Sequence, residues 1–433
     1  MELRLLKRQT TGLSAASWLW NHAGFGPGPG DLNIIGNLSE TDAIDWFVDP
    51  DAHDVAPTPE PWIDTDYENY EPGPAGRDLA GQAISEWVDA MATGPRPLVE
   101  QMAWFWHGHL VSGLDKVRNP YALIVQVRRF RRLGLDGNLG ALLREITTDA
   151  AMLRYLDGAD SVAGAPNENY SRELLELFAL GIGNYTEADV QAGAIALTGW
   201  TSPRRGNSTT SGIFRPRRHD DTPQTYLGRS GVRDVETVIE AVLGHAACGP
   251  FVARSIARHL LGPGVDTTAT AAMGVEFAND GYRFRPLLRS ILTYGLEHQP
   301  ELQREAAGPV AWLVSAARAL EIPTIDGRLV RGLHGMGQVP LAPPNVAGWP
   351  RGDAWLTATA TIGRANVALA LGALTPPDSA ARAAAERGDM AALASLLGVD
   401  SGFSDANAEV ITSVSATAER LALALVTDEV VRR

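Results

Sequence analysis

Residues 166–177 carry the densest set of side chains that could do chemistry in this sequence. They read Pro-Asn-Glu-Asn-Tyr-Ser-Arg-Glu-Leu-Leu-Glu-Leu. On a regular helix the tyrosine and the leucines take one arc, and Glu168, Arg172, Glu173 and Glu176 take the other. Glu173 and Glu176 are three residues apart, so both carboxylates could reach one metal ion, as in carboxylate-rich helical bundles.

The charged face has two interpretations. If it is exposed, Arg172 bridges Glu168 and Glu176 at i,i+4 spacing, and each pair contributes only a few tenths of a kcal/mol. If it is buried, the carboxylates bind a metal, although the Glu-x-x-His pairs of di-iron and di-manganese bundles are missing here. A buried ion-pair network that fixes helix register would use the same residues.

Two histidines lie in a second helical pattern, residues 98–112. His109 falls in the middle of its apolar face, and His107 points nearly opposite, beside Glu100. Residues two apart do not share a helix face, so we do not expect both histidines to bind one metal. We expect His109 to be the buried one. It is either a core histidine with one hydrogen bond or a metal ligand or general base.

A third candidate is His219-Asp220-Asp221. An imidazole beside two carboxylates suits a hard or borderline cation, and a plain polar turn is the alternative. Residues 212–216 and 224–228 flank it with strand-like composition. We therefore expect these segments to pair as a short hairpin with the three polar residues at its tip.

Helices must position these groups. Helical period covers most of the chain, and Thr186 with Asp189 resembles a capping box. Loops rich in Pro and Gly separate the helices. We expect a mainly helical, all-α fold with one short β-hairpin, in three parts: residues 1–95, a central core at 96–305, and a C-terminal region at 306–433. The clearest expected helices are 78–91, 98–112, 121–133, 139–149, 168–180, 187–197, 235–243 and 251–261, and the loops are 24–30, 49–76, 202–211 and 341–350.

Composition excludes several classes of protein. A chain of 433 residues with 45% hydrophobic content can bury a large core. The net charge of -14 argues against binding to nucleic acid or anionic lipid. For the basic run Arg128 to Arg132 we expect a solvated face or internal ion pairs. Cys248 is the only cysteine, which leaves no internal disulfide and no thiolate zinc site.

The sequence also lacks several signatures. It has no export signal at its N-terminus and no stretch long enough to span a membrane, so we expect a cytoplasmic protein. It has no P-loop, no nucleophile elbow and no His-Glu-x-x-His, and therefore no nucleotide cofactor signature.

Together these motifs resemble the bacterial family catalogued as domain of unknown function 1800. The matching blocks extend over nearly the whole chain: residues 5–8, 105–109, 119–123, 151–157, 166–181, 185–190, 198–200, 219–220, 227–228, 337–338 and 343–349. The resemblance implies where a site lies, at 166–177, and leaves its reaction open. Many members look exported and are encoded beside a sulfatase-like family, which implies a possible protein partner. This chain departs from them in having no visible export signal and in having Gly108 between its two histidines.

The leading hypothesis is a metal-dependent enzyme, with oxidative chemistry favoured over hydrolysis and with iron, manganese or zinc as the divalent metal. The assigned roles are metal ligands His109, Glu173, Glu176, His219 and Asp220, catalytic groups Glu168, Arg172 and His107, and substrate contacts Asn167, Trp200, Asn345 and Trp349. One alternative is a scaffold or partner-binding protein whose Glu/Arg cluster is structural. Another is a metal-free acid–base enzyme in which Glu173 or Glu176 has a raised pKa and His109 relays protons.

Overall fold

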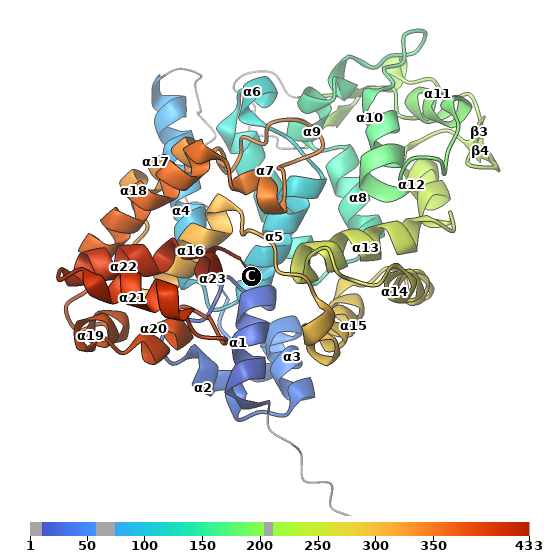
Figure 1. Ribbon diagram of the computed structural model, residues 1–433. Coiled ribbons are helices and arrows are strands. Elements are labelled where there is room, and N and C mark those ends of the chain that lie inside the picture. The colour runs from blue at the N-terminus through green and yellow to red at the C-terminus, as the bar shows by residue number, and fades with distance from the viewer. Residues whose placement is uncertain (1–10, 58–73, 203–210, 433) are drawn as a thin grey trace, which may run out of the picture.

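The computed structural model describes residues 11–57, 74–202 and 211–432. Helices make up most of this part of the chain, as predicted (Figure 1). The loops expected at 24–30 and 341–350 are present, whereas most of those at 49–76 and 202–211 lies outside the described residues.

A central helix, α5 (Pro97–His109), organises the fold (Figure 1). Ten of its thirteen residues are buried, including Glu100, Gln101 and His107. A helix that is enclosed on nearly all sides must satisfy its polar side chains inside the protein. It packs on α1 (Gly12–Ala23), α3 (Glu40–Val48), α4 (Pro74–Thr93) and α7 (Pro120–Leu133).

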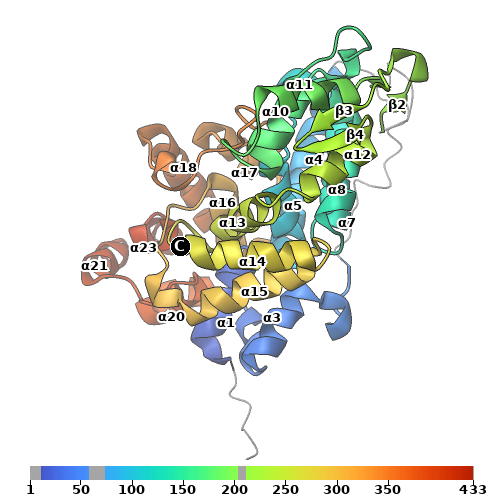
Figure 2. The same cartoon turned by 90° about the vertical axis from the view of Figure 1, so that its right-hand side faces the viewer.

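Three groups of helices surround α5, and Figures 1 and 2 show them at different ends of the molecule. The N-terminal helices α1, α2 (Asp31–Gly36) and α3 lie beside α14 (Thr267–Asn279) and α15 (Phe284–Glu297). The C-terminal group contains α16 (Pro309–Ala319), α17 (Gly327–Met336), α18 (Ala358–Leu374), α19 (Ala380–Arg387), α20 (Met390–Leu396), α21 (Asp405–Ser413), α22 (Thr417–Leu425) and α23 (Asp428–Val431). The third group contains α6 (Leu114–Val117), α8 (Leu139–Thr147), α9 (Ala150–Tyr155), α10 (Asn169–Glu173), α11 (Glu187–Ala196), α12 (Val235–Leu243) and α13 (Cys248–Leu261).

The strands pair differently from the prediction. β1 (Trp200–Thr201) pairs with β2 (Ile213–Phe214), and β3 (Gln224–Tyr226) pairs with β4 (Arg229–Val232), all antiparallel. The short hairpin is therefore β3–β4, and pairing of 212–216 with 224–228 was wrong. The tight turn Leu227-Gly228, with positive φ at both residues, directs β3 onto β4 instead.

Some helix ends differ from the expected positions, because side chains cap the backbone there. The helix expected at 139–149 ends at Thr147, because the Asp149 carboxylate accepts hydrogen bonds from Ala151 N and Met152 N and begins α9. The expected capping box of Thr186 and Asp189 is confirmed at α11. The helix expected at 168–180 is α-helical only to Glu173 and continues as a π-helix, η4 (Leu174–Ala179).

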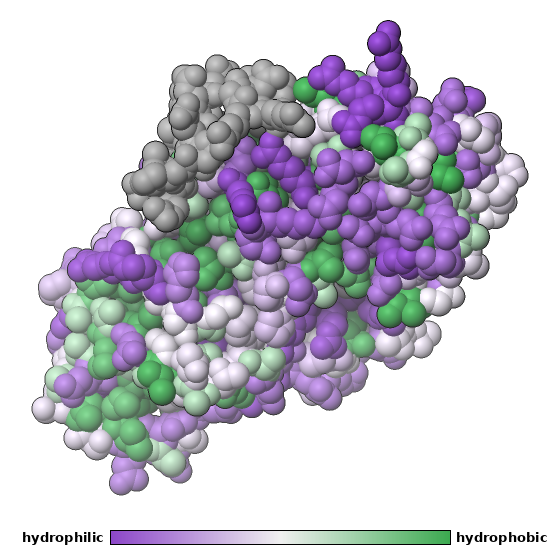
Figure 3. All heavy atoms as spheres, turned by 90° about the horizontal axis from the view of Figure 1, so that it is seen from above, coloured by the Kyte–Doolittle hydropathy of each residue, from purple (hydrophilic) through white to green (hydrophobic). Residues whose placement is uncertain are grey.

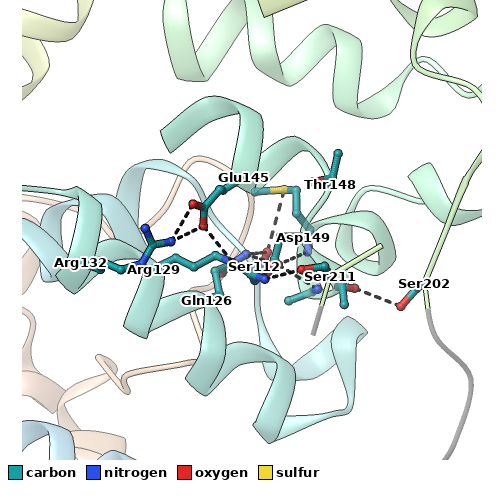
Figure 4. A network of polar contacts seen from close by, with 12 residues as sticks. Ser112, Gln126, Arg129, Arg132, Glu145, Thr148, Asp149, Ser202 and Ser211 are labelled. Carbon is teal, nitrogen blue, oxygen red and sulfur yellow. Dashed lines mark hydrogen bonds and ion pairs between the residues drawn. The ribbon is translucent and has the colours of Figure 1, made fainter. Parts of the chain in front are cut away.

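The basic run on α7 forms internal ion pairs. Arg131 pairs with Glu100 at 2.6 Å, and both side chains are almost completely buried. Arg129 pairs with the buried Asp149, which also accepts from Gln126 Nε2 at 2.9 Å (Figure 4). Part of the prediction for this run, internal pairing, is therefore confirmed.

No single helix among the described residues has the length and apolar character needed to cross a membrane. One pair, α12 and α13, meets the length and composition together but is bent by 78°.

Candidate functional site

The carboxylate face of α10 is exposed. Arg172 bonds to Glu168 at 3.0 Å and to Glu187 of α11 at 2.5 Å, and the three side chains are 36%, 39% and 58% exposed. Figure 3 views the molecule from above and shows many hydrophilic residues on the side where Figure 1 places α10 and α11. The exposed interpretation of this helix is therefore the observed one, with Glu187 as a partner that the helical pattern did not reveal.

Glu176 does not pair with Arg172, contrary to the prediction. Its Oε2 accepts a hydrogen bond from the Tyr185 hydroxyl at 2.7 Å. The change from α- to π-helix at Leu174 adds residues to the turn and rotates Glu176 away from the position that regular spacing gives it. Glu173 is partly buried, and this burial, together with the charge of Glu176, raises its pKa.

Both histidines of α5 are shielded from water, His107 completely and His109 partly. His107 is completely buried, and its Nε2 accepts a hydrogen bond from Leu341 N at 3.0 Å. Burial lowers the pKa of His107 to about 3. The prediction that His109 is the buried one was wrong, because residues 341–350 cover the side of α5 that the helical pattern marked as polar.

His109 is only partly buried and stays neutral. Its Nε2 lies 2.9 Å from the Phe178 carbonyl, which can only accept, so Nε2 carries the proton. The ring stacks on Phe105 with centroids 5.1 Å apart. Burial lowers the pKa of His109 to about 4. This matches a histidine satisfied by one hydrogen bond.

His219 and Asp220 are bonded to a neighbouring loop. Nδ1 of His219 lies 2.9 Å from the Thr198 carbonyl, and Asp220 N donates to Thr198 Oγ1 at 2.9 Å. Asp220 Oδ1 accepts from Thr222 N at 3.1 Å. His219 and Trp200 line a separate hollow of about 420 Å³ with Phe214. These contacts match the plain polar turn.

Within the part of the chain that the structure describes, no three His, Cys, Asp or Glu side chains come together to hold a metal ion. The five predicted ligands therefore do not converge into one group. Of the predicted substrate contacts, Asn345 is exposed and Asn167 bonds through its backbone N to Ser161 Oγ at 3.0 Å.

A cavity of about 200 Å³ lies beside α5, and Trp349 is the one predicted site residue among its described walls. It is bounded by α5, the end of α13, and residues 305–311 and 347–355. The side chains that matter for its chemistry are Trp104, His259, Glu305, Trp349, Arg351 and Trp355.

The loop that carries Trp349 is held against α5 by a close backbone approach. Gly348 has φ +83°, and a Cβ there would lie 2.3 Å from the Gly108 carbonyl oxygen. Only glycine allows both this conformation and this contact. Trp349 consequently stacks on Trp104, with ring centroids 4.7 Å apart and an interplanar angle of 22°. Gly108 does not interrupt α5, which remains helical to His109. The Trp349 ring lies next to this glycine, where a Cβ would be 3.6 Å from the ring.

Buried polar contacts fix the opposite wall. Arg364 donates to the Trp355 carbonyl at 2.9 Å and to the Ala307 carbonyl at 2.7 Å. It thereby ties the segment that carries Trp355 to the segment that follows Glu305. Gly352 has φ +56°, and a Cβ there would lie 3.0 Å from Glu305 Oε2, so the loop passes directly over the carboxylate.

The charged groups of the cavity shift one another's pKa values. Burial raises the pKa of Glu305, and Arg258 and Arg351 oppose this shift. Arg351 is exposed at the cavity, and the partial shielding by its neighbours, then Arg258, lowers its pKa, while Glu305 opposes this shift. Burial, then Arg351, lowers the pKa of His259 to about 3, so this imidazole is neutral at pH 7.

Sequence reasoning missed Glu305, Arg351, His259 and Arg258. Arg258 and His259 are neighbours on α13, whereas Glu305 and Arg351 come from two other, distant segments, so no single helical pattern contains the group. One signal was available: Arg351 follows two residues after Trp349, at the end of the Pro/Gly-rich loop 341–350.

The comparisons with known proteins identify a family and no characterised relative. A family described as "Protein of unknown function (DUF1800)" matches residues 18–430. No curated protein matches the chain, and no solved structure matches it.

Proposed function

Because the chain belongs to the DUF1800 family, whose description gives no function, we propose from the cavity itself that this protein is an acid–base enzyme. In this proposal Glu305 transfers the proton and Arg351 binds the substrate. The proposal does not use a metal ion.

The observation that carries the proposal is the position of Glu305 and Arg351 in the wall of one cavity, among three tryptophans. Small-molecule sites are typically concave and largely aromatic, with a few polar groups that orient the ligand. A carboxyl whose pKa is raised by burial exchanges a proton more readily near neutral pH than an ordinary glutamate. Raised carboxyl pKa values are typical of such sites.

The remaining polar groups of the cavity support this division of roles. Gln338 Oε1 accepts from Val310 N at 2.9 Å, and Gln101 Nε2 donates to the Gly24 carbonyl. Each of these two side chains already makes a hydrogen bond that holds a wall of the cavity. The charged side chains are left to contact a substrate.

The metal-dependent enzyme and the scaffold stay predictions. Metal content, measured on protein purified without chelators, tests the first. A copurified stoichiometric metal that restores activity after removal would support metal dependence and contradict the acid–base proposal. Recovery of one stoichiometric partner, for example from the sulfatase-like companion family, would support the scaffold.

The acid–base proposal is tested with chromogenic esters, glycosides and phosphoesters as substrates. We expect turnover by the wild-type chain in the presence of a chelator, and a loss of about 10²- to 10⁴-fold in kcat for Glu305→Gln. Glu173→Gln is the matched control, because Glu173 is another partly buried carboxyl with a raised pKa but lies outside the cavity. Equal rates for wild type and Glu305→Gln, or no turnover of any substrate, would refute the proposal.

A further inference from the structure

We propose that the cavity binds a small ligand that joins an oxyanion group to a flat ring. Arg351, supported by Arg258, binds the oxyanion, and the tryptophan walls bind the ring. This inference rests on the proposed function for the location of the site and adds the chemical class of the ligand.

Arg351 and the nearby Arg258 bring two positive charges to the cavity. Among the described residues, the guanidinium groups of Arg258 and Arg351 form no ion pair and no hydrogen bond. The two groups are close enough for Arg258 to lower the pKa of Arg351. Both side chains are exposed, so an anion can reach them, and two neighbouring positive charges without direct partners attract it.

The neighbouring carboxylates do not neutralise this charge. Glu305 is the one acidic group among the described wall residues, and burial raises its pKa. Asp353 is bonded to Arg432 at 2.7 Å, and Arg432 also bonds to Asp428 at 2.9 Å. Arg351 in the cavity wall and Arg258 near it therefore outnumber the one carboxylate of the wall, in a chain whose net charge is -14.

The geometry of the arginine side chain indicates which anions the cavity could bind. A guanidinium presents planar pairs of N–H donors that match carboxylate, phosphate or sulfate oxygens. Five amide and imidazole side chains of the wall each make a hydrogen bond to the main chain, and none is a cation: Asn21, His22, Gln101, His259 and Gln338. Recognition is thus left to Arg351, with Glu305 next to it.

The tryptophan walls indicate that the ligand has a flat ring. Trp104 and Trp349 stack on each other, and Trp349 and Trp355 both line the cavity. Aromatic walls favour flat ligands that stack or make edge contacts. The volume of about 200 Å³ suits a single ring with one oxyanion group, since an apolar cavity of about 150 Å³ accommodates benzene. Benzoate is therefore a suitable probe.

Glu305 makes this binding depend on pH. The charged groups that face Glu305 are Arg258 of α13, Arg351 and Asp353, and the nearby His259 is neutral above pH 5. Protonation of Glu305 removes its repulsion of a bound anion. Affinity for an anion of constant charge should therefore rise as the pH falls through the pKa of Glu305, which is above its ordinary value.

The experiment is calorimetric titration of the full chain with benzoate, acetate and sulfate at pH 7. We expect benzoate to bind more tightly than acetate, because only benzoate has a ring. We expect Arg351→Gln to weaken benzoate binding at least about tenfold, and Arg351→Lys to weaken it less. Arg229→Gln is the matched control, because Arg229 is an exposed arginine paired with Glu240 outside the cavity, and it should bind as wild type does.

A sulfate titration from pH 5 to 8 tests the role of Glu305. Sulfate keeps its charge over this range, so tighter binding at low pH reports on the protein. Glu305→Gln should bind sulfate more tightly at pH 7 and lose most of the pH dependence. Melting temperatures of all variants show whether they are folded.

The inference and the proposed function can fail separately. Unchanged benzoate binding in folded Arg351→Gln, or equal binding of benzoate and acetate, would overturn the oxyanion-and-ring ligand, whatever the turnover assays show. If Arg351 controls benzoate binding while Glu305→Gln leaves turnover unchanged, the ligand class stands and the acid–base role of Glu305 falls.

Discussion

Two of the arginine–carboxylate clusters in this protein, one on α7 and one on α10, differ in burial. On α7, the side chains of Arg131 and Glu100 are 4% and 0% exposed. On α10, those of Arg172 and Glu187 are 36% and 58% exposed. The pairs are similar in length, at 2.6 and 2.5 Å, so distance does not distinguish them. Burial decides whether losing one partner leaves a charge in water or inside the protein.

The largest effect is expected for Glu100→Gln. The glutamine retains the size of the side chain but leaves Arg131 buried without its carboxylate, and it weakens the hydrogen bond from Trp87 Nε1, which is 3.2 Å long. We expect the free energy of unfolding to fall by about 3–5 kcal/mol. Denaturant unfolding monitored by tryptophan fluorescence measures this change. A loss below about 1 kcal/mol would show that burial does not separate the two clusters.

The same substitution in the exposed cluster, Glu187→Gln, should cost much less. Arg172 keeps Glu168 at 3.0 Å and remains accessible to water. We expect a much smaller loss in the free energy of unfolding than for Glu100→Gln, reduced further by added salt. Unfolding at low and high ionic strength provides the measurement. A larger, salt-independent loss would mean that this cluster behaves like the buried one.

The smallest effect concerns pH. The hydrogen bond from Arg172 lowers the pKa of Glu187 below 4.5. A carboxyl with a lowered pKa in the folded state stabilises the protein above its unfolded pKa, and this contribution is lost as the pH falls. The difference in melting temperature between wild type and Glu187→Gln should therefore be present at pH 7 and shrink below pH 4.5. A difference that grows on acidification would contradict the assignment.

The same comparison explains why residues 166–177 drew attention as a site. Dense charge in a sequence marks a water-exposed helix face as well as a functional cluster. The cavity has fewer charges in total, but Glu305 and Arg351 face it from segments that are separated in the chain. Charge that is held without a direct partner in a hollow is more informative about function than charge density along one helix.

Much of the fold followed from local patterns. The expected helices match α4, α5, α7, α8, α11, α12 and α13 to within a few residues at most ends, because amphipathic period and capping side chains are local properties. Strand pairing was missed, since two-residue strands carry little pattern and their partners depend on neighbouring turns. The π-helix was missed because its register change at Leu174 has no sequence pattern of its own.

By itself, the sequence determined the helical architecture and the membership of a family. The tertiary structure decided which charged groups are paired, buried or left facing a cavity. His107 and His109 illustrate the reason: their positions on α5 are set by helix geometry, but their burial depends on a loop more than 200 residues later in the chain. Burial and charge pairing are long-range properties, and they determine both pKa values and binding.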